Sequence, residues 1–292
     1  MSHGFRVAGA ALALIIAGAG TSASAASTQF AVWLDGNTSA GGGGNGILTS
    51  LDNAFGAGHY TLVSTADLET TGFLSPFGAI VVSRFGSAFG TSMSALAASN
   101  VAAYVGSGPG QGGVAVFTND ASDNLFGSTS GDPFDANLDR LFTNSATFAL
   151  SSGHGYIGEF NGAVMALASN TAGFASIGLL TGSASAVRGF GSLFTYDVGP
   201  IGPGHPIDAG VTFPFTDSDG STFLTDITGA DPTNIVDIYT SAGISGEPAV
   251  LANATIISGG VPEPASWALM LVGFAGLGAT LRGSRRKAVI AV

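Results

Sequence analysis

The sequence predicts an α/β fold in which a parallel β-sheet is flanked by helices. The runs Ala79–Val82 and Val114–Phe117 are continuously apolar, which is typical of strands that helices cover on both faces. Between them lies Met93–Tyr104, whose apolar residues recur at helical spacing. Strands that alternate with helices form parallel sheets with right-handed crossovers. The content of Thr, Ser and Gly leaves an all-β sandwich open as the alternative.

The first half of the chain supplies the clearest elements. Ile47, Leu48, Leu51 and Phe55 fall on one face of a predicted helix, and Gly56 just after them is a typical helix stop. The expected order is strand Phe30–Leu34, helix Ile47–Phe55, strand Tyr60–Val63, strand Ala79–Val82, helix Met93–Tyr104 and strand Val114–Phe117.

The second half has weaker patterns. Stretches rich in Gly, Pro and Asp predict surface loops at Gly199–Gly204 and Phe213–Pro232. The other expected elements are strand Ala146–Leu150, a tight turn at Gly153–Phe160, a short helix Ala163–Ala168, and strands Ile177–Leu180, Leu193–Tyr196 and Ala249–Asn253.

The N-terminus has the pattern of a signal peptide. Arg6 precedes an apolar stretch of thirteen residues, Val7–Ala19, and Ala23-Ser24-Ala25 fits the small-x-small cleavage rule. We expect signal peptidase to remove residues 1–25, so that the mature chain begins at Ala26.

The C-terminus predicts a short membrane helix. Trp267–Leu281 is a run of fifteen uncharged residues, or about 23 Å of helix at about 1.5 Å per residue. This length is marginal against a hydrocarbon core about 30 Å thick, and residues 265 and 266 extend the helix to about 265–281. Trp267 suits the membrane interface, and a basic tail prefers the cytoplasmic side, with the body outside. The tail contains Arg282, Arg285, Arg286 and Lys287.

This segment resembles the PEP-CTERM sorting signal, because the triplet Pro262, Glu263 and Pro264 precedes the helix and its basic tail. The same segment is also described as an ice-binding-protein C-terminal domain. The resemblance implies processing by an exosortase-type enzyme after transient anchoring in the inner membrane. It further implies delivery to the outer surface or the extracellular matrix, where matrix polysaccharide is an expected partner.

The body between these ends, residues 26–260, is predicted to be one exported acidic α/β domain. It holds eighteen acidic residues against Arg84, Arg140 and Arg188, so 3 minus 18 gives a net charge of −15. A body this acidic, without lysine, has no means of binding nucleic acid through its phosphates. The chain has no cysteine, which excludes disulfides, thiolate nucleophiles and cysteine-based metal sites.

The body also resembles the class I glutamine amidotransferase-like proteins, which have a flavodoxin-like fold. The resemblance rests on strands Phe30–Leu34, Ala79–Val82 and Val114–Phe117, and on Ser83–Gly86, Gly153–Gly158, Gly204–Ile207 and Glu247–Val250. It implies that a strand-turn-helix elbow near His154–Gly158 would present the nucleophile. Because these residues include no Cys, a thioester mechanism is impossible, and the site would be degenerate or used for binding.

His154, Glu159 and His205 are the remaining candidates for proton transfer or for part of a metal shell. No nucleophile accompanies them at a recognised spacing. The interpretation we favour at this point is therefore that the two histidines are exposed loop residues.

The acidic runs suggest calcium as the one conceivable cofactor. Asp217 and Asp219 lie two residues apart before Gly220, as in the start of a calcium loop. The complete EF-hand spacing is absent, since Thr228 stands where a glutamate is required. Asp132, Asp135 and Asp139 are a second acidic set. Solvated loops and helix caps explain both sets better than a bound ion.

These observations predict an exported, sorted protein whose acidic domain has a noncatalytic binding or structural role. The alternative is a secreted hydrolase-like enzyme with a site near His154 and His205, at the carboxyl ends of the strands. Ice or carbohydrate adhesion through a flat Thr-rich face is a third hypothesis and ranks last, because regular Thr-x-Thr repeats are absent.

Overall fold

The computed structural model describes the body of the protein with interruptions. The described residues are 30–34, 46–83, 93–107, 111–119, 121–128, 133–151, 153–159, 180, 183–189 (backbone only), 193–217 and 223–253. The predicted signal peptide 1–25, the sorting segment 261–292 and the helix Ala163–Ala168 lie outside them. No helix in the described ranges is both long and apolar enough to cross a membrane.

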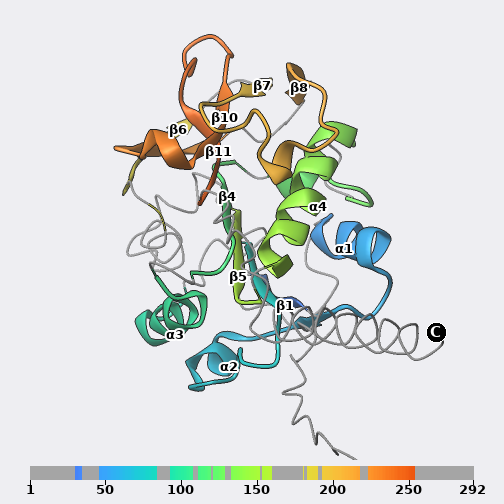
Figure 1. The fold of residues 1–292 in the computed structure, drawn as a ribbon, viewed down its shortest axis with the longest axis vertical. Coiled ribbons are helices and arrows are strands. Elements are labelled where there is room, and N and C mark those ends of the chain that lie inside the picture. Colours follow the sequence, from blue (N-terminus) through green and yellow to red (C-terminus); the bar gives the residue numbers. More distant parts are fainter. Residues whose placement is uncertain are drawn as a thin grey trace, which may run out of the picture.

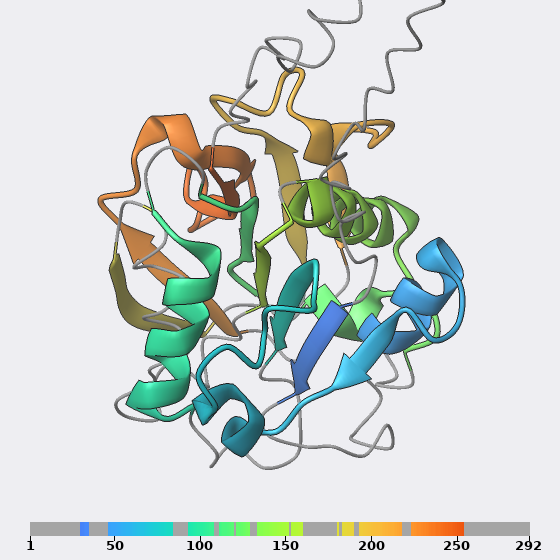
Figure 2. The same ribbon diagram turned by 60° about the horizontal axis from the view of Figure 1, so that its bottom comes forward.

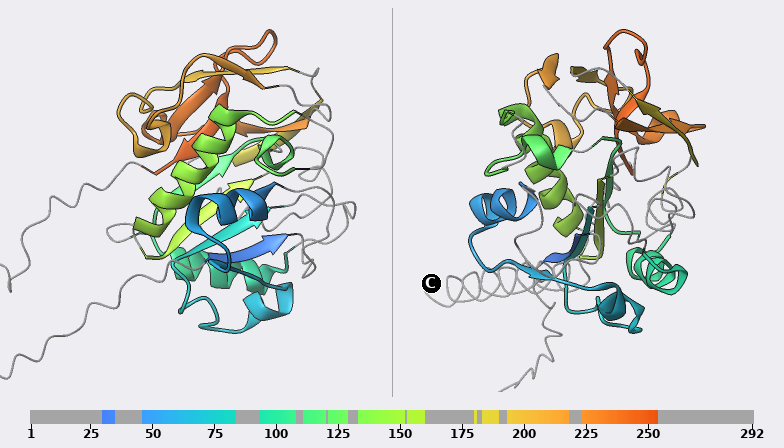
Figure 3. Two further views of the ribbon diagram at one scale, coloured as in Figure 1. Left: turned by 90° about the vertical axis from the view of Figure 1, so that its right-hand side faces the viewer. Right: turned by 180° about the vertical axis from the view of Figure 1, so that it is seen from behind.

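A nine-stranded mixed sheet runs through the body (Figures 1 and 3). Its spatial order is β2-β1-β3-β5-β4-β11-β10-β7-β8. The bounds are β1 Phe30–Leu34, β2 Tyr60–Leu62, β3 Ala79–Ser83, β4 Val114–Phe117, β5 Gly155–Glu159, β7 Phe194–Val198, β8 Phe215–Asp217, β10 Ile235–Tyr239 and β11 Pro248–Ala252.

The sheet has a parallel half and an antiparallel half. Strands β2, β1, β3, β5 and β4 pair in parallel, whereas β11, β10, β7 and β8 continue the sheet from β4 in antiparallel pairs. The α/β prediction is confirmed, and the all-β sandwich is excluded. The prediction that the whole sheet is parallel is wrong for the second half, because β7, β8, β10 and β11 follow one another without long helical crossovers.

Helices cover both faces of the sheet, as Figures 1 and 2 show. Helices α1 (Ile47–Phe55) and α4 (Ala136–Ser151) pack on one face. The second face carries α2 (Thr65–Glu69) and α3 (Ala95–Val105). The α2 helix begins with a reciprocal capping box between Ser64 and Asp67.

Alternation along the strands divides the apolar residues between two clusters. In β1, Phe30, Val32 and Leu34 join the cluster under α1 and α4, whereas Ala31 and Trp33 join the cluster under α2 and α3. All five residues of β1 are buried. Because successive side chains of a strand point to opposite faces, a continuously apolar strand supplies both clusters at once.

A small two-stranded antiparallel sheet accompanies the large one. It consists of β6 (Ser183–Gly189) and β9 (Phe223–Thr228). The amide of Thr225 in β9 donates to the carbonyl of Thr118 at the end of β4, 2.6 Å away. Three 3-10 helices complete the elements: η1 Ala121–Asn124, η2 Pro206–Asp208 and η3 Pro232–Asn234.

Strands β1, β3, β4 and helix α1 confirm the expectations for the first half, and β7 and β11 confirm two strands of the second. Two predictions for the middle of the chain are wrong. Ala146–Leu150 is the last part of α4 rather than a strand, because its apolar residues continue the helical stripe that begins at Leu138.

Gly153–Phe160, predicted as a tight turn, instead contains the buried strand β5. Its glycines serve close packing: a Cβ added at Gly155 would lie 2.2 Å from the carbonyl oxygen of Ala149 in α4. The predicted loop Phe213–Pro232 is also partly wrong, because it contains β8 and β9. Their pairing partners come from distant parts of the chain, which a local pattern cannot show.

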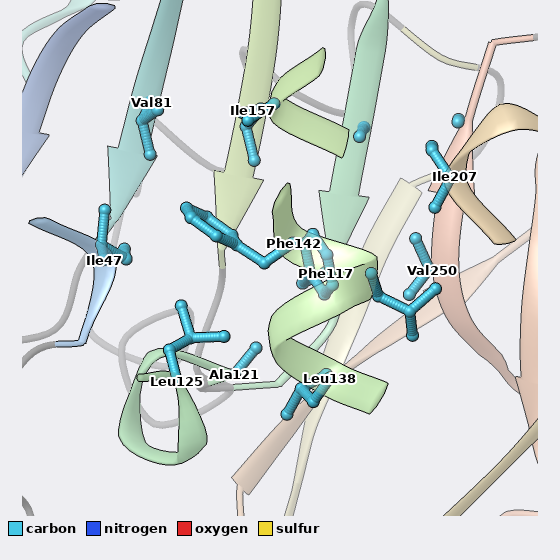
Figure 4. Packing of buried hydrophobic residues seen from close by; sticks show 14 of the residues in the cluster. Ile47, Val81, Phe117, Ala121, Leu125, Leu138, Phe142, Ile157, Ile207 and Val250 are labelled. Carbon is cyan, nitrogen blue, oxygen red and sulfur yellow. The ribbon is translucent and has the colours of Figure 1, made fainter. Parts of the chain in front are cut away.

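Phe142 of α4 lies at the centre of the first cluster, with its ring among residues from the sheet and from η1 (Figure 4). Its ring centroid is 6.3 Å from that of Phe117, and its side chain is 1% exposed. We expect Phe142→Ala to lower the free energy of unfolding by about 3–5 kcal/mol, because it leaves a cavity in a packed core. Chemical denaturation measures this change.

The matched control is Phe126→Ala, since Phe126 is 43% exposed. It should lower the free energy of unfolding by about 1 kcal/mol or less. Equal effects of the two substitutions would contradict the assigned packing.

Candidate functional site

The carboxyl ends of the parallel strands, where ligands of open α/β sheets usually bind, carry a buried polar network. Ser83 ends β3 and lies opposite Glu159, which ends β5. The carboxylate of Glu159 is 3% exposed. It accepts a hydrogen bond from the Ser83 hydroxyl at 2.5 Å and a second from the backbone amide of Ser122 in η1. Glu159 therefore joins three segments of this edge.

The end of β4 links this network to the antiparallel half. The Thr118 hydroxyl lies 3.0 Å from the Tyr239 hydroxyl, and the Asn119 side chain donates to the Tyr196 hydroxyl at 2.7 Å. Among the described residues, the Asn119 Oδ1 and Ser122 Oγ atoms are buried without a hydrogen-bond partner. The other contacts join the ends of β3, β4 and β5 to η1 and to the antiparallel half.

His154 lies at the opposite, amino edge of the sheet, immediately before β5. It is exposed, and its ring meets the Tyr104 ring of α3 edge to face, with centroids 5.4 Å apart. Glu159 lies at the far end of the same strand, about 16 Å away at about 3.3 Å per residue. The structure does not bring these two residues together.

His205 also lies near the amino edge, on the other face of the sheet from His154. Its Nε2 is 3.5 Å from the carbonyl oxygen of Asn253, and the side chain of Asn253 accepts from the amide of Val114 at the start of β4. Its ring packs on Phe148 of α4, with centroids 5.1 Å apart. Burial lowers the pKa of His205, and the hydrogen bond with Asn253 opposes this effect. The imidazole is therefore neutral at pH 7.

The sequence-based hypothesis expected both histidines at the carboxyl ends of the strands. In the structure both lie near the amino edge, so this part of the hypothesis is wrong. His205 is 6% exposed rather than an exposed loop residue, because it caps η2 by accepting from the Ile207 amide. His154 is exposed, as expected.

The acidic residues of the calcium hypothesis have other surroundings. Asp217 is buried at the end of β8, and Asp219 lies outside the described residues. Asp135 caps α4 by accepting from the amides of Asn137 and Leu138. Asp139 accepts from the Ser50 hydroxyl at 2.6 Å. In the described ranges no group of three His, Asp or Glu side chains is arranged to hold a metal ion.

A pair of buried aspartates escaped the sequence analysis. Asp208 in η2 and Asp237 in β10 interact through their carboxyl groups. In the described part of the protein, none of their four oxygens accepts a hydrogen bond from any other residue. The signal in the sequence is a lone carboxylate in the apolar run Ile235–Tyr239. Only the fold brings Asp208 beside it.

Proton sharing explains how two acids tolerate this position. The pKa of Asp208 is raised to about 7, because the effect of burial exceeds the opposing effect of a hydrogen bond with Asp237. Burial also raises the pKa of Asp237, reinforced by Asp208 and by repulsion from Asp197. The backbone crowds the pair: a Cβ at Gly202 would lie 2.6 Å from Asp208 Oδ2. One proton held between the carboxyl groups removes most of their mutual repulsion.

A cavity of about 320 Å³ opens at the amino edge, beside His154. The turn Thr70–Ser75, the α3 residues Asn100, Ala103 and Tyr104, and His154 line it, with Leu68 as a further apolar wall. The sequence analysis singled out His154 but not the turn, because turn residues have no periodic pattern. This cavity is a candidate binding site built from described residues.

In comparisons with protein-family models, curated proteins and solved structures, we found no match to this chain.

The aspartate pair predicts an unusual dependence of stability on pH. Because the folded-state pKa values exceed the ordinary value of 3.8, the folded protein binds more protons than the unfolded chain between about pH 4 and pH 7. Stability from this pair is complete below that window and is lost as the pH rises through about 7. We expect Asp237→Asn to flatten the dependence and to stabilise the protein by about 2 kcal/mol at pH 8.

Thermal and chemical unfolding between pH 4.5 and 8 measure this effect. The matched control is Asp231→Asn, at an exposed helix cap where hydrogen bonds from Thr233 lower the pKa of the carboxyl. That variant should keep the wild-type slope. If the stability of Asp237→Asn depends on pH as steeply as that of the wild type, the two aspartates do not share a proton.

Proposed function

We propose that this protein is exported, sorted at the inner membrane by an exosortase-type enzyme, and released to the cell surface or extracellular matrix. There its acidic body has a noncatalytic binding or structural role. The single observation that carries the sorting is the order of features after residue 260: Pro262-Glu263-Pro264, a short apolar run, and four basic residues. Signal peptidase, the exosortase-type enzyme, the membrane and matrix polysaccharide are the proposed partners.

The organisation of the body is compatible with a removable tail. As far as the chain is described, both hydrophobic clusters are built from residues between Phe30 and Ala252. The last strand, β11, lies inside the sheet between β4 and β10. The described contacts lie within residues 30–253, and the proposed cleavage would act on the chain after them.

The placement of the polar residues favours binding over hydrolysis. His154, His205 and Glu159, the proton-transfer candidates, lie at separate positions on two faces and two edges of the sheet. The carboxylate of Glu159 already accepts two hydrogen bonds. A hydrolase-like enzyme with a site near His154 and His205 is the weaker proposal, because a proton relay needs these groups within hydrogen-bond reach.

The finer fold assignment is also a proposal. The parallel strands have the order 2-1-3-5-4, whereas the flavodoxin-like order is 2-1-3-4-5. We propose a variant of the flavodoxin-like arrangement in which the fourth and fifth strands have exchanged places. The shared part of the order, with helices on both faces, supports this relationship to the amidotransferase-like proteins.

The sorting proposal predicts two processing events. Full-length protein expressed in a host with an exosortase system should yield a mature species that begins at Ala26 and has lost its basic tail, as intact-mass analysis would show. Truncation before Val261 should abolish the membrane-bound precursor, because it removes the helix and the basic residues that stop transfer. Cell fractionation measures the precursor.

The matched control replaces Arg282, Arg285, Arg286 and Lys287 with Gln and keeps the apolar run. It should insert less stably and accumulate less precursor than the wild type, but more than the truncated protein. If the truncated and complete chains show the same distribution and processing, the tail is not a sorting signal.

A further inference from the structure

The cavity beside His154 has rigid walls. Three successive turns shape one side, since the amides of Phe73, Ser75 and Phe77 donate to the carbonyls of Thr70, Gly72 and Leu74 at 3.0–3.1 Å. Gly72 adopts a φ of +78°, a conformation that other residues rarely reach. These contacts hold the turn in place without a ligand, so that binding would require little ordering of the chain.

Hydrogen bonds also fix the wall formed by α3. The side chain of Asn100 donates to the carbonyl of Leu68 at 2.8 Å, and the Tyr104 hydroxyl donates to the carbonyl of Phe77 at 2.9 Å. Asn100 is thereby oriented with its Oδ1 available as an acceptor. Burial raises the pKa of Tyr104, so its hydroxyl is neutral at any physiological pH.

The lining combines ring surfaces with neutral polar groups. Phe73, Tyr104 and His154 supply rings, while Thr71, Ser75 and Asn100 supply hydroxyl and amide groups. No Lys, Arg, Asp or Glu is among the described residues that line the cavity. The nearby carboxylate of Glu69 accepts from the Ser94 hydroxyl at 2.6 Å. A phosphate or carboxylate ligand would thus find no Lys or Arg among these residues.

The geometry points to a neutral, hydroxyl-rich ring compound, a pyranose unit of a neutral glycan, as the ligand of this cavity. Such a ring has two apolar faces of C–H groups that pack on aromatic side chains, and a rim of hydroxyls that exchange hydrogen bonds with hydroxyl and amide groups. The volume of about 320 Å³ is at the lower end of the range of about 300–1,000 Å³ for small-ligand pockets. It suits one or two sugar rings rather than a long chain.

This inference rests on the proposed binding role and locates it in the fold. A neutral ligand is also compatible with the net charge of −15 on the body. An uncharged glycan is not repelled by an acidic protein, whereas an anionic one would be.

The test is calorimetric titration of the full chain, in a detergent without a sugar headgroup, with maltose, cellobiose and N,N′-diacetylchitobiose. Galacturonic acid serves as the anionic probe. At least one neutral disaccharide should bind, and more tightly than galacturonic acid. Asn100→Ala should weaken binding about five- to tenfold through loss of one hydrogen bond, and Ala103→Trp should abolish it by filling the cavity.

Leu96→Ala is the matched control, because Leu96 is an exposed α3 residue outside the lining, and it should bind like the wild type. Ser75→Trp is a second cavity-filling variant on the opposite wall, to be used if Ala103→Trp lowers the unfolding temperature. Absence of binding to all three neutral disaccharides, or unchanged binding after filling the cavity, would overturn the inference. Neither result affects the sorting proposal, which depends on processing and fractionation.

Discussion

Burial of the central sheet on both faces is the constraint on which the rest of the structure depends. The chain has no cysteine, so no disulfide stabilises the body and its stability must come from apolar packing. Strands β1, β3 and β4 meet this requirement because their residues alternate between a cluster under α1 and α4 and a second cluster under α2 and α3. Each helix is positioned in turn by the stripe of apolar residues that it buries against the sheet.

A shortage of cations determines how the body accommodates its acids. Three arginines cannot neutralise eighteen carboxylates, and burying an uncompensated charge is expensive. The described acids show two solutions. Glu159 and Asp139 accept hydrogen bonds from serine hydroxyls and backbone amides. Asp208 and Asp237 interact with each other without a donor from another described residue, and burial raises the pKa of both carboxyls, which favours the neutral form.

The two edges of the parallel half consequently differ in character. At the carboxyl edge, the Ser83 hydroxyl and the Ser122 amide donate to Glu159, and this network joins the ends of the strands. At the amino edge, the turn after α2 and the outer part of α3 leave a cavity with neutral walls beside His154. This cavity, formed by described residues, therefore lies at the edge opposite the one where ligands of α/β proteins generally bind.

Local composition and spacing were enough to predict the α/β class, the strands with continuous apolar runs, the charge of the body and sorted export. The same reasoning misassigned Ala146–Leu150 and Gly153–Phe160. A short apolar run is typical of a strand and also of a buried helix segment, and a set of glycines is typical of a turn and also of a closely packed strand. The position of β5 between β3 and β4, the opposite faces of His154 and His205, and the meeting of Asp208 with Asp237 could be seen only in the fold. These relations arise from pairing and packing between segments far apart in the chain, and the local sequence carries no signal for them.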